Sequence, residues 1–234
     1  LIVMRHNEAG SAARAAEVSN IPIINAGDGA GQHPTQALLD MYTIVDAFRE
    51  FDSLKVAMVG DLRHGRTVHS LCKLLCLFKG VQVVLVSPSE LRMPGAIVEQ
   101  LRASGHEVLE SEALETSIRH VDIVYSTRIQ EERFSSQQEA DLYRGRFRLN
   151  QSIYTEHCEP NTVIMHPLPR DSRVTARELD DDLNDNPNLA IFRQTDNGVL
   201  VRMALFTLVL DVVEQVHKHA RDVNWYTGGR FDGL

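Results

Sequence analysis

The sequence contains few cysteines, no long hydrophobic run and no surplus of basic residues, and each shortage excludes a class of protein. Its three cysteines, Cys72, Cys76 and Cys158, are too few and too unevenly spaced for a disulfide framework, which favours a reducing, cytoplasmic setting. The longest apolar stretch, near Met203 to Val213, is interrupted by Asp211 and is too short to span a bilayer. The net charge is −8 and the arginines are scattered, so we expect neither nucleic acid nor a membrane as partner.

Length and composition are those of a packed protein. Hydrophobic residues make up 43% of the sequence and charged residues 24%, which is far from the composition of a disordered chain. A chain of 234 residues can form one large domain or two modest ones, and we expect two. The first residue is Leu1 and not methionine, and residues 1–4 indicate a buried strand, so we expect that the chain lacks its natural beginning.

Short apolar runs alternate with amphipathic helical patterns along most of the chain, which predicts an α/β protein. Continuous apolar strands separated by helices indicate parallel sheets flanked by helices on both faces. The expected strands are residues 1–6, 21–25, 55–61, 81–87, 122–126 and 162–166. The expected helices are 12–18, 34–48, one from about residue 66, one near residue 97, and a terminal helix over 198–219.

These elements predict two domains with parallel sheets, of which the first is incomplete. Residues 1–48 form the end of the first domain and a linker helix, and residues 49–195 form the second domain. Residues 196–234 form a terminal helix that returns to the first domain, followed by a tail. The acidic run over residues 178–188 is interpreted as a solvated loop, because such carboxylates usually face water.

One helix places three possible metal ligands on one face. His69, Cys72 and Cys76 follow at spacings of three and four. A structural zinc site needs four ligands and the sequence shows no fourth, so we expect no metal.

Loops rich in glycine, histidine and arginine follow several strands, and ligands of open α/β sheets bind where such loops leave the strands. In NAGDGAGQHPTQ (residues 25–36) glycines allow a tight bend, and His33 is presented just before a helix N-terminus, which suits an anion. A simple tight turn is the alternative. In GDLRHGRTVHS (60–70) the fork of Arg66 suits a carboxylate or phosphate, and a surface ion pair is the alternative.

Two further loops complete the candidate site. In STRIQEERF (residues 126–134) Arg128 and Gln130 are alternate residues of an extended segment, so both side chains could reach one ligand. In HPLPR (166–170) two prolines make a rigid turn that could aim the Leu168 carbonyl into a cleft, and a stiff connector is the alternative. Two separate arginine loops indicate a ligand with two acidic groups.

Taken together these segments resemble the aspartate carbamoyltransferase family, in order from residue 1 to about residue 210. The motifs are NAGDG, QHPTQ, GDLRHGRTVHS, TRIQEER and HPLPR. The resemblance implies that Arg5 and His33 contact the carbamoyl group and phosphate of carbamoyl phosphate and are the catalytic residues. It places Gln36 at the carbamoyl amide, and the carbonyls of Leu168 and Pro169 against the carbamoyl and amino groups, with a cis bond before Pro169.

The resemblance also implies a second binding site and a mechanism. Arg66 and Arg128 hold the two carboxylates of L-aspartate, Gln130 assists Arg128, and the Leu168 carbonyl contacts the aspartate amine. The amine attacks the carbamoyl carbon through a tetrahedral intermediate and phosphate leaves, in the committed step of pyrimidine biosynthesis. Neither cofactor nor metal is expected. A homotrimer is implied, alone or with regulatory or dihydroorotase subunits.

Two departures from the family pattern leave alternatives open. The family's S-x-R-T phosphate loop, and the Ser/Lys loop that an adjacent subunit supplies, belong upstream of Leu1. A non-catalytic or truncated assembly subunit is therefore one alternative, and an ornithine carbamoyltransferase is a weaker one. Glu131 stands where many relatives carry lysine, which could change domain closure or a pairing with Arg133. The chain beyond Leu210, through the tail that ends at residue 234, matches nothing in the family.

Overall fold

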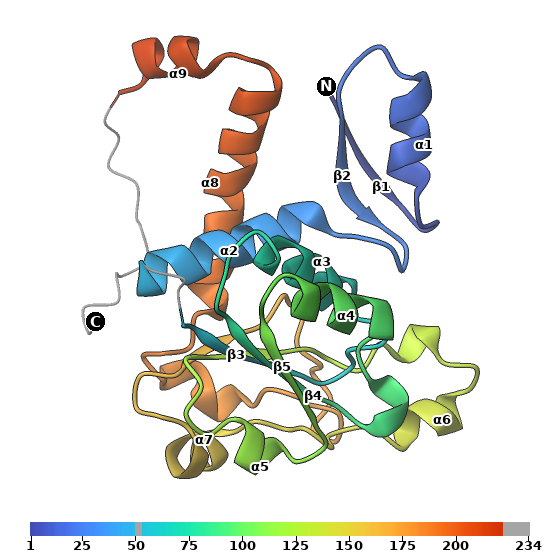
Figure 1. Ribbon diagram of the computed structural model, residues 1–234, viewed down its shortest axis with the longest axis vertical. Coiled ribbons are helices and arrows are strands. Elements are labelled where there is room, and N and C mark those ends of the chain that lie inside the picture. Colours follow the sequence, from blue (N-terminus) through green and yellow to red (C-terminus); the bar gives the residue numbers. More distant parts are fainter. Residues whose placement is uncertain (50–52, 222–234) are drawn as a thin grey trace.

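Two separate parallel sheets make up the computed structural model, which describes residues 1–49 and 53–221 (Figure 1). The tail after residue 221 lies outside the described residues. The α/β class with parallel sheets and flanking helices is confirmed, while the domain bounds stay a prediction. Among the described residues, no helix is long and apolar enough to cross a membrane.

The small sheet pairs the first two strands in parallel. Strands β1 (Ile2–His6) and β2 (Ile23–Asp28) are joined by helix α1 (Ser11–Val18). Helix α2 (Pro34–Phe48) follows, and it begins at a proline, whose fixed φ and missing N–H suit the first helical position. We interpreted residues 1–4 as a buried strand, and this is wrong. Ile2 is 44% exposed, because within the described residues β1 has β2 as its only strand partner.

The large sheet has five parallel strands in the order β5-β4-β3-β6-β7. Its strands are β3 (Lys55–Val59), β4 (Gln82–Val86), β5 (Glu107–Ser111), β6 (Ile123–Ser126) and β7 (Val163–Met165). Its helices are α3 (Arg66–Leu75), α4 (Gly95–Ala103), α5 (Leu114–Ser117), α6 (Gln137–Asp141) and α7 (Gln151–His157). The sequence pattern missed β5, because this edge strand buries little and has glutamates at two of its five positions.

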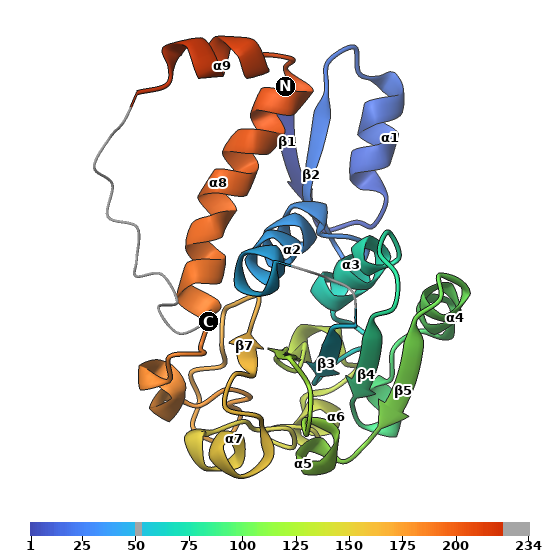
Figure 2. The same cartoon turned by 60° about the vertical axis from the view of Figure 1, so that its left-hand side comes forward.

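Side chains of the central strand alternate between two apolar cores, as the period of two in a strand requires. Val56 and Met58 join α2, α3 and α4 in one core, and Ala57 and Val59 join the other, which α7 covers. The helices therefore lie on both faces of the sheet (Figure 2). This arrangement leaves the loops at the carboxyl ends of the strands exposed for binding.

The terminal helix differs from the predicted one in start and continuity. Helix α8 (Ile191–Val209) begins seven residues before Gly198. It ends before Asp211, which has a φ of 54°, and α9 (Val213–His219) follows as a separate helix. Gly198 misled the prediction because glycine is a poor helix former. Here it packs against Leu39 of α2, and a Cβ would crowd that contact and Arg202.

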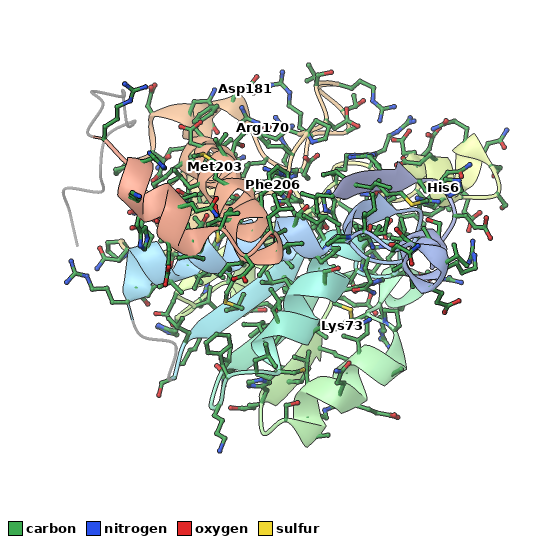
Figure 3. The ribbon with its side chains drawn as sticks, turned by 90° about the horizontal axis from the view of Figure 1, so that it is seen from above. His6, Lys73, Arg170, Asp181, Met203 and Phe206 are labelled. Carbon is green, nitrogen blue, oxygen red and sulfur yellow. The ribbon has the colours of Figure 1, made fainter. Side chains whose placement is uncertain are left out.

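The acidic run over residues 178–188 is only in part the solvated loop that we expect: Asp181, Asp182 and Asp185 are exposed, but the other two acidic residues are not. Glu178 and Asp180 are buried, and Asp180 accepts from Arg148 Nε at 2.8 Å. Leu183, in the short 3-10 helix of residues 181–185, is fully buried. Arg170 lies beside the more exposed Asp181 (Figure 3). Contacts with basic residues such as Arg148, and the burial of Leu179 and Leu183, turn part of this segment inward. The spacing of the acidic residues in the sequence does not reveal these contacts.

Candidate functional site

A cavity of about 650 Å³ lies where the strand ends of the two sheets meet. All eight residues predicted for the site line it, although their roles stay predictions: Arg5, His33, Gln36, Arg66, Arg128, Gln130, Leu168 and Pro169. Other lining residues were not predicted as members of the site, among them Asn7, His64, Arg133 and Arg202. Arg202 lies on α8, and a single arginine on a helix gives no sequence signal of a site. A second cavity of about 420 Å³, near α5, contains none of the predicted residues.

The glycine-rich loop after β2 is held by Asp28. Its Oδ1 accepts from the N–H of Gln32 at 2.6 Å, and its Oδ2 accepts from the N–H of Gly10 at 2.7 Å. Burial raises the pKa of Asp28, but these and other hydrogen bonds lower it further, so the net shift is downward. Gly29, with a φ of +53°, lies against the Asn7 carbonyl, where a Cβ would clash with the backbone. Glycine therefore allows the ends of β1 and β2 to meet at the cavity.

His33 is a neutral imidazole at the start of α2. Burial, followed by the nearby charges of Arg66, Arg5 and Arg202, lowers the pKa of His33 to about 4. Its Nδ1 lies 3.4 Å from the Thr35 hydroxyl. If that hydroxyl donates to Nδ1, the ring carries its proton on Nε2 and can donate to a ligand. The backbone N–H of His33 donates to Ser70 Oγ at 2.9 Å and fixes the start of the helix.

Arg66, the first residue of α3, brings positive charge to the same end of the cavity. Its Nη1 donates to the Gly29 carbonyl at 2.8 Å. The pKa of Arg66 is lowered by burial and by Arg5 and Arg133, which shows that positive charges gather here. Such a cluster suits an anion, and phosphate or carboxylate matches the guanidinium fork.

Arg128 lies two residues after the end of β6 (Ile123–Ser126) and is paired with a carboxylate of its own chain. Its two Nη atoms donate to Glu132 at 3.1 and 2.7 Å, and the Glu132 bonds raise its pKa. The neighbouring Gln130 lines the same cavity, and its N–H donates to Asp61 Oδ2 at 3.1 Å. A ligand carboxylate at Arg128 must therefore share the guanidinium with Glu132 or displace it.

The turn after β7 is rigid. The Leu168–Pro169 bond is cis, as the family resemblance implies, and Leu168 has a φ of 57°. The N–H of Leu168 donates to His166 Nδ1 at 2.9 Å, and His166 Nε2 lies 2.8 Å from Glu178 Oε1. Buried His166 thus fixes the turn through these contacts, and His166, Leu168 and Pro169 all line the cavity.

Glu131 connects two of the loops that line the cavity. It accepts from Arg144 Nε at 2.6 Å and from Arg173 Nη2 at 2.6 Å, and these two arginines depress the pKa of Glu131. The expected alternative of a pairing with Arg133 is wrong. The carboxylate of Glu131 instead pairs with Arg144 and Arg173, which come from other parts of the chain.

Glu131→Gln is expected to lower the free energy of unfolding by roughly 1–2 kcal/mol, because it removes the charge from two charge-assisted hydrogen-bond pairs. The depressed pKa predicts the same loss in the wild type as the pH falls below the ordinary glutamate range. Thermal unfolding measures the change. Glu112→Gln is the matched control, since Glu112 pairs with Arg92 on the open surface, where such a pair contributes little. Equal melting temperatures for both variants contradict the prediction.

The three possible metal ligands, two on α3 and the third just after its end, each have another contact. His69 Nε2 lies 2.7 Å from the Leu62 carbonyl, buried Cys72 contacts Met58, and Cys76 Sγ lies 3.3 Å from the Cys72 carbonyl. Within residues 1–49 and 53–221, no group of three or more histidine, cysteine or acidic side chains is placed to hold a metal ion.

Comparisons with known proteins agree with this geometry. Two family models match: the carbamoyl-P binding domain of aspartate/ornithine carbamoyltransferase over residues 1–46, and its Asp/Orn binding domain over residues 52–209. The aspartate carbamoyltransferase catalytic subunit of Cellvibrio japonicus is 67% identical, over 98% of this chain and 69% of that protein. That of Saccharophagus degradans is also 67% identical, over 99% of this chain and 70% of that protein.

Solved structures show the same likeness. The catalytic subunit of M. jannaschii aspartate transcarbamoylase has a TM-score of 0.80 and 43% identity, covering 91% of this chain and 67% of that one. The Trypanosoma cruzi aspartate transcarbamoylase in complex with aspartate and phosphate has a TM-score of 0.77 and 36% identity, covering 87% and 62%. The two matched segments of our chain divide the cavity between them, since Arg5 and His33 lie in the first and Arg66 and Arg128 in the second.

Proposed function

The chain belongs to the aspartate/ornithine carbamoyltransferase family, and we propose that its cavity transfers the carbamoyl group of carbamoyl phosphate to the amine of L-aspartate. The products are N-carbamoyl-L-aspartate and phosphate, in the committed step of pyrimidine biosynthesis. One observation supports this most strongly. Neutral His33 lies in a single cavity among three arginines, Arg5, Arg66 and Arg202. The same cavity also contains Arg128 and the neighbouring Gln130.

The carbamoyl phosphate end of the cavity is assigned to Arg5, His33 and Gln36. Arg5 binds anionic oxygen, neutral His33 donates to the carbamoyl oxygen, and Gln36 accepts from the carbamoyl amide. The tetrahedral intermediate carries developing negative charge on that oxygen, so donors already fixed in place stabilise it more than the ground state. A neutral donor also leaves its proton in place throughout the reaction.

The two carboxylates of aspartate are assigned to Arg66, which lies near His33, and to Arg128, with Gln130 beside Arg128. The carbonyls of Leu168 and Pro169 accept from the amine and the carbamoyl amide. This positions the nitrogen lone pair against the carbamoyl carbon. The C–N bond forms, the C–O bond to phosphate breaks, and the departing phosphate accepts the proton lost by the amine.

The first test is carbamoyl transfer by the full-length protein, with aspartate and ornithine as parallel acceptors. Transfer to aspartate alone is the expected result, because two arginines match two carboxylates and ornithine carries only one. Transfer to ornithine, or none to either acceptor, contradicts the proposal.

We also propose a homotrimer in the cytoplasm, alone or with regulatory or dihydroorotase subunits. The family likeness supports the trimer, and three free cysteines suit a reducing compartment. A native mass that corresponds to a monomer at assay concentration contradicts the trimer.

A further inference from the structure

A buried carboxylate, Asp40, lies directly behind the cavity on α2. It is fully buried, and its oxygens accept three hydrogen bonds from neutral donors. Oδ1 accepts from Gln36 Nε2 at 2.9 Å and from Gln194 Nε2 at 2.6 Å, while Oδ2 accepts from the Tyr125 hydroxyl at 2.7 Å. A buried charge is unfavourable, so three converging donors at this position need an explanation.

The carboxylate determines which way the amide of Gln36 faces. An ionised carboxylate only accepts hydrogen bonds, so the Gln36 NH2 must turn toward Asp40 and the amide oxygen is left for the cavity that Gln36 lines. Burial raises the pKa of Asp40 to about 6, which still leaves the group mainly ionised above neutral pH. The cavity is thus given a fixed acceptor at this point.

The same carboxylate orients a second amide that leads to the rigid turn. Because Gln194 Nε2 faces Asp40, its Oε1 is free to accept, and it accepts from the His166 N–H at 3.0 Å. His166 Nδ1 in turn accepts from the Leu168 N–H at 2.9 Å. One continuous set of hydrogen bonds therefore connects Gln36 with the turn on the other side of the cavity.

We propose that Asp40 is a positioning residue that makes the site selective for a carbamoyl group over an acetyl group. This inference rests on the proposed function. The carbamoyl NH2 is a donor and needs the acceptor that Asp40 fixes on Gln36. In acetyl phosphate a methyl group of similar size takes the place of the NH2, and a methyl group leaves the Gln36 oxygen without its partner.

The test compares the Ki of acetyl phosphate with the KM of carbamoyl phosphate in the full-length protein. In Asp40→Ser, whose side chain is too short to hold Gln36, the ratio of Ki to KM should fall about tenfold, close to the value of one hydrogen bond. The KM should rise while the Ki stays nearly constant. Asp40→Asn should keep the ratio within about threefold, because its oxygen can still accept from both glutamines while its NH2 donates to Tyr125.

The matched control is Thr43→Val, one helical turn further along α2. Thr43 accepts from Asn197 of α8 at 3.0 Å, so its loss breaks a buried contact between the same two helices without touching Gln36. In Thr43→Val the free energy of unfolding should fall, while the ratio of the Ki of acetyl phosphate to the KM of carbamoyl phosphate should stay unchanged. A general loosening of the site instead raises Ki and KM together in Asp40→Ser, and that result overturns the inference.

A measurement on the wild-type protein applies even if Asp40→Ser does not fold. In NMR of side-chain amides, the Gln36 Nε2 protons should be protected from solvent exchange with and without carbamoyl phosphate. Exchange as fast as that of an exposed glutamine overturns the inference. Failure of the wild type to transfer carbamoyl groups contradicts the proposed function, whereas normal transfer with an unchanged ratio in Asp40→Ser contradicts the role of Asp40 alone.

Discussion

His33→Ala is expected to lower the turnover number by about 10²–10³, the loss that follows removal of one donor to a developing oxyanion. The KM values of both substrates should change much less, because the hydrogen bond is strongest in the tetrahedral intermediate. Steady-state kinetics with both substrates varied measures the two effects separately. His106→Ala is the control, since His106 is a buried histidine bonded to Val81 and Leu75 and lies outside the cavity. A normal turnover number in His33→Ala leaves His33 as a structural residue.

The pH dependence tests the charge state of the same histidine. With the pKa of His33 lowered to about 4 by burial and three arginines, the wild type should show no loss of turnover from His33 as the pH falls from 8 to about 5. The lowered pKa of His33 also makes the free energy of unfolding depend on pH. The unfolded chain gains the proton near the ordinary value of 6.5 and the folded protein only near 4, so His33 opposes folding increasingly as the pH falls through that range. A fall in the turnover number of the wild type around pH 6.5, which does not occur in His33→Ala, contradicts a neutral donor.

The sequence predicted the members of the candidate site better than their pairing. Glycine-rich and arginine-rich loops after apolar strands place Arg66 and Arg128 at one edge of a parallel sheet, and the structure brings them to one cavity. The spacing of residues along the sequence does not show which carboxylate pairs with a given arginine. The partners of Glu131 lie 13 and 42 residues away, so only the packed fold brings them together.

Fold elements were predictable where the apolar pattern was strong and failed where packing overrode it. The central strands were found because they are apolar on both faces. Strand β5 and the buried residues within the 178–188 segment were missed, since both stretches are rich in acidic side chains and owe their positions to neighbours distant in sequence. The role of Asp40 was also missed, because an aspartate on an amphipathic helix normally faces water. Its partners Tyr125 and Gln194 lie 85 and 154 residues away in the sequence.

Arg128→Ala is expected to weaken the use of aspartate by about 2–5 kcal/mol, the range for removing one partner of a hydrogen-bonded charge pair. At about 1.4 kcal/mol for each tenfold, kcat/KM for aspartate should fall by roughly 30-fold to several thousandfold. The KM of carbamoyl phosphate should change little, because Arg5 and His33 lie in the other matched segment. Arg92→Ala is the control, as this arginine forms an exposed pair outside the cavity. Unchanged saturation by aspartate removes Arg128 from the site.

Part of that loss comes from the carboxylate that Arg128 leaves behind. Glu132 accepts from both Nη atoms of Arg128, so the alanine variant places an unpaired negative charge where a substrate carboxylate binds. The double variant Arg128→Ala with Glu132→Gln separates the two effects. Removing the repulsion should recover part of kcat/KM, and the remaining deficit measures the guanidinium fork itself. A double variant no better than Arg128→Ala shows that Glu132 turns into solvent when unpaired and that the whole loss belongs to the arginine.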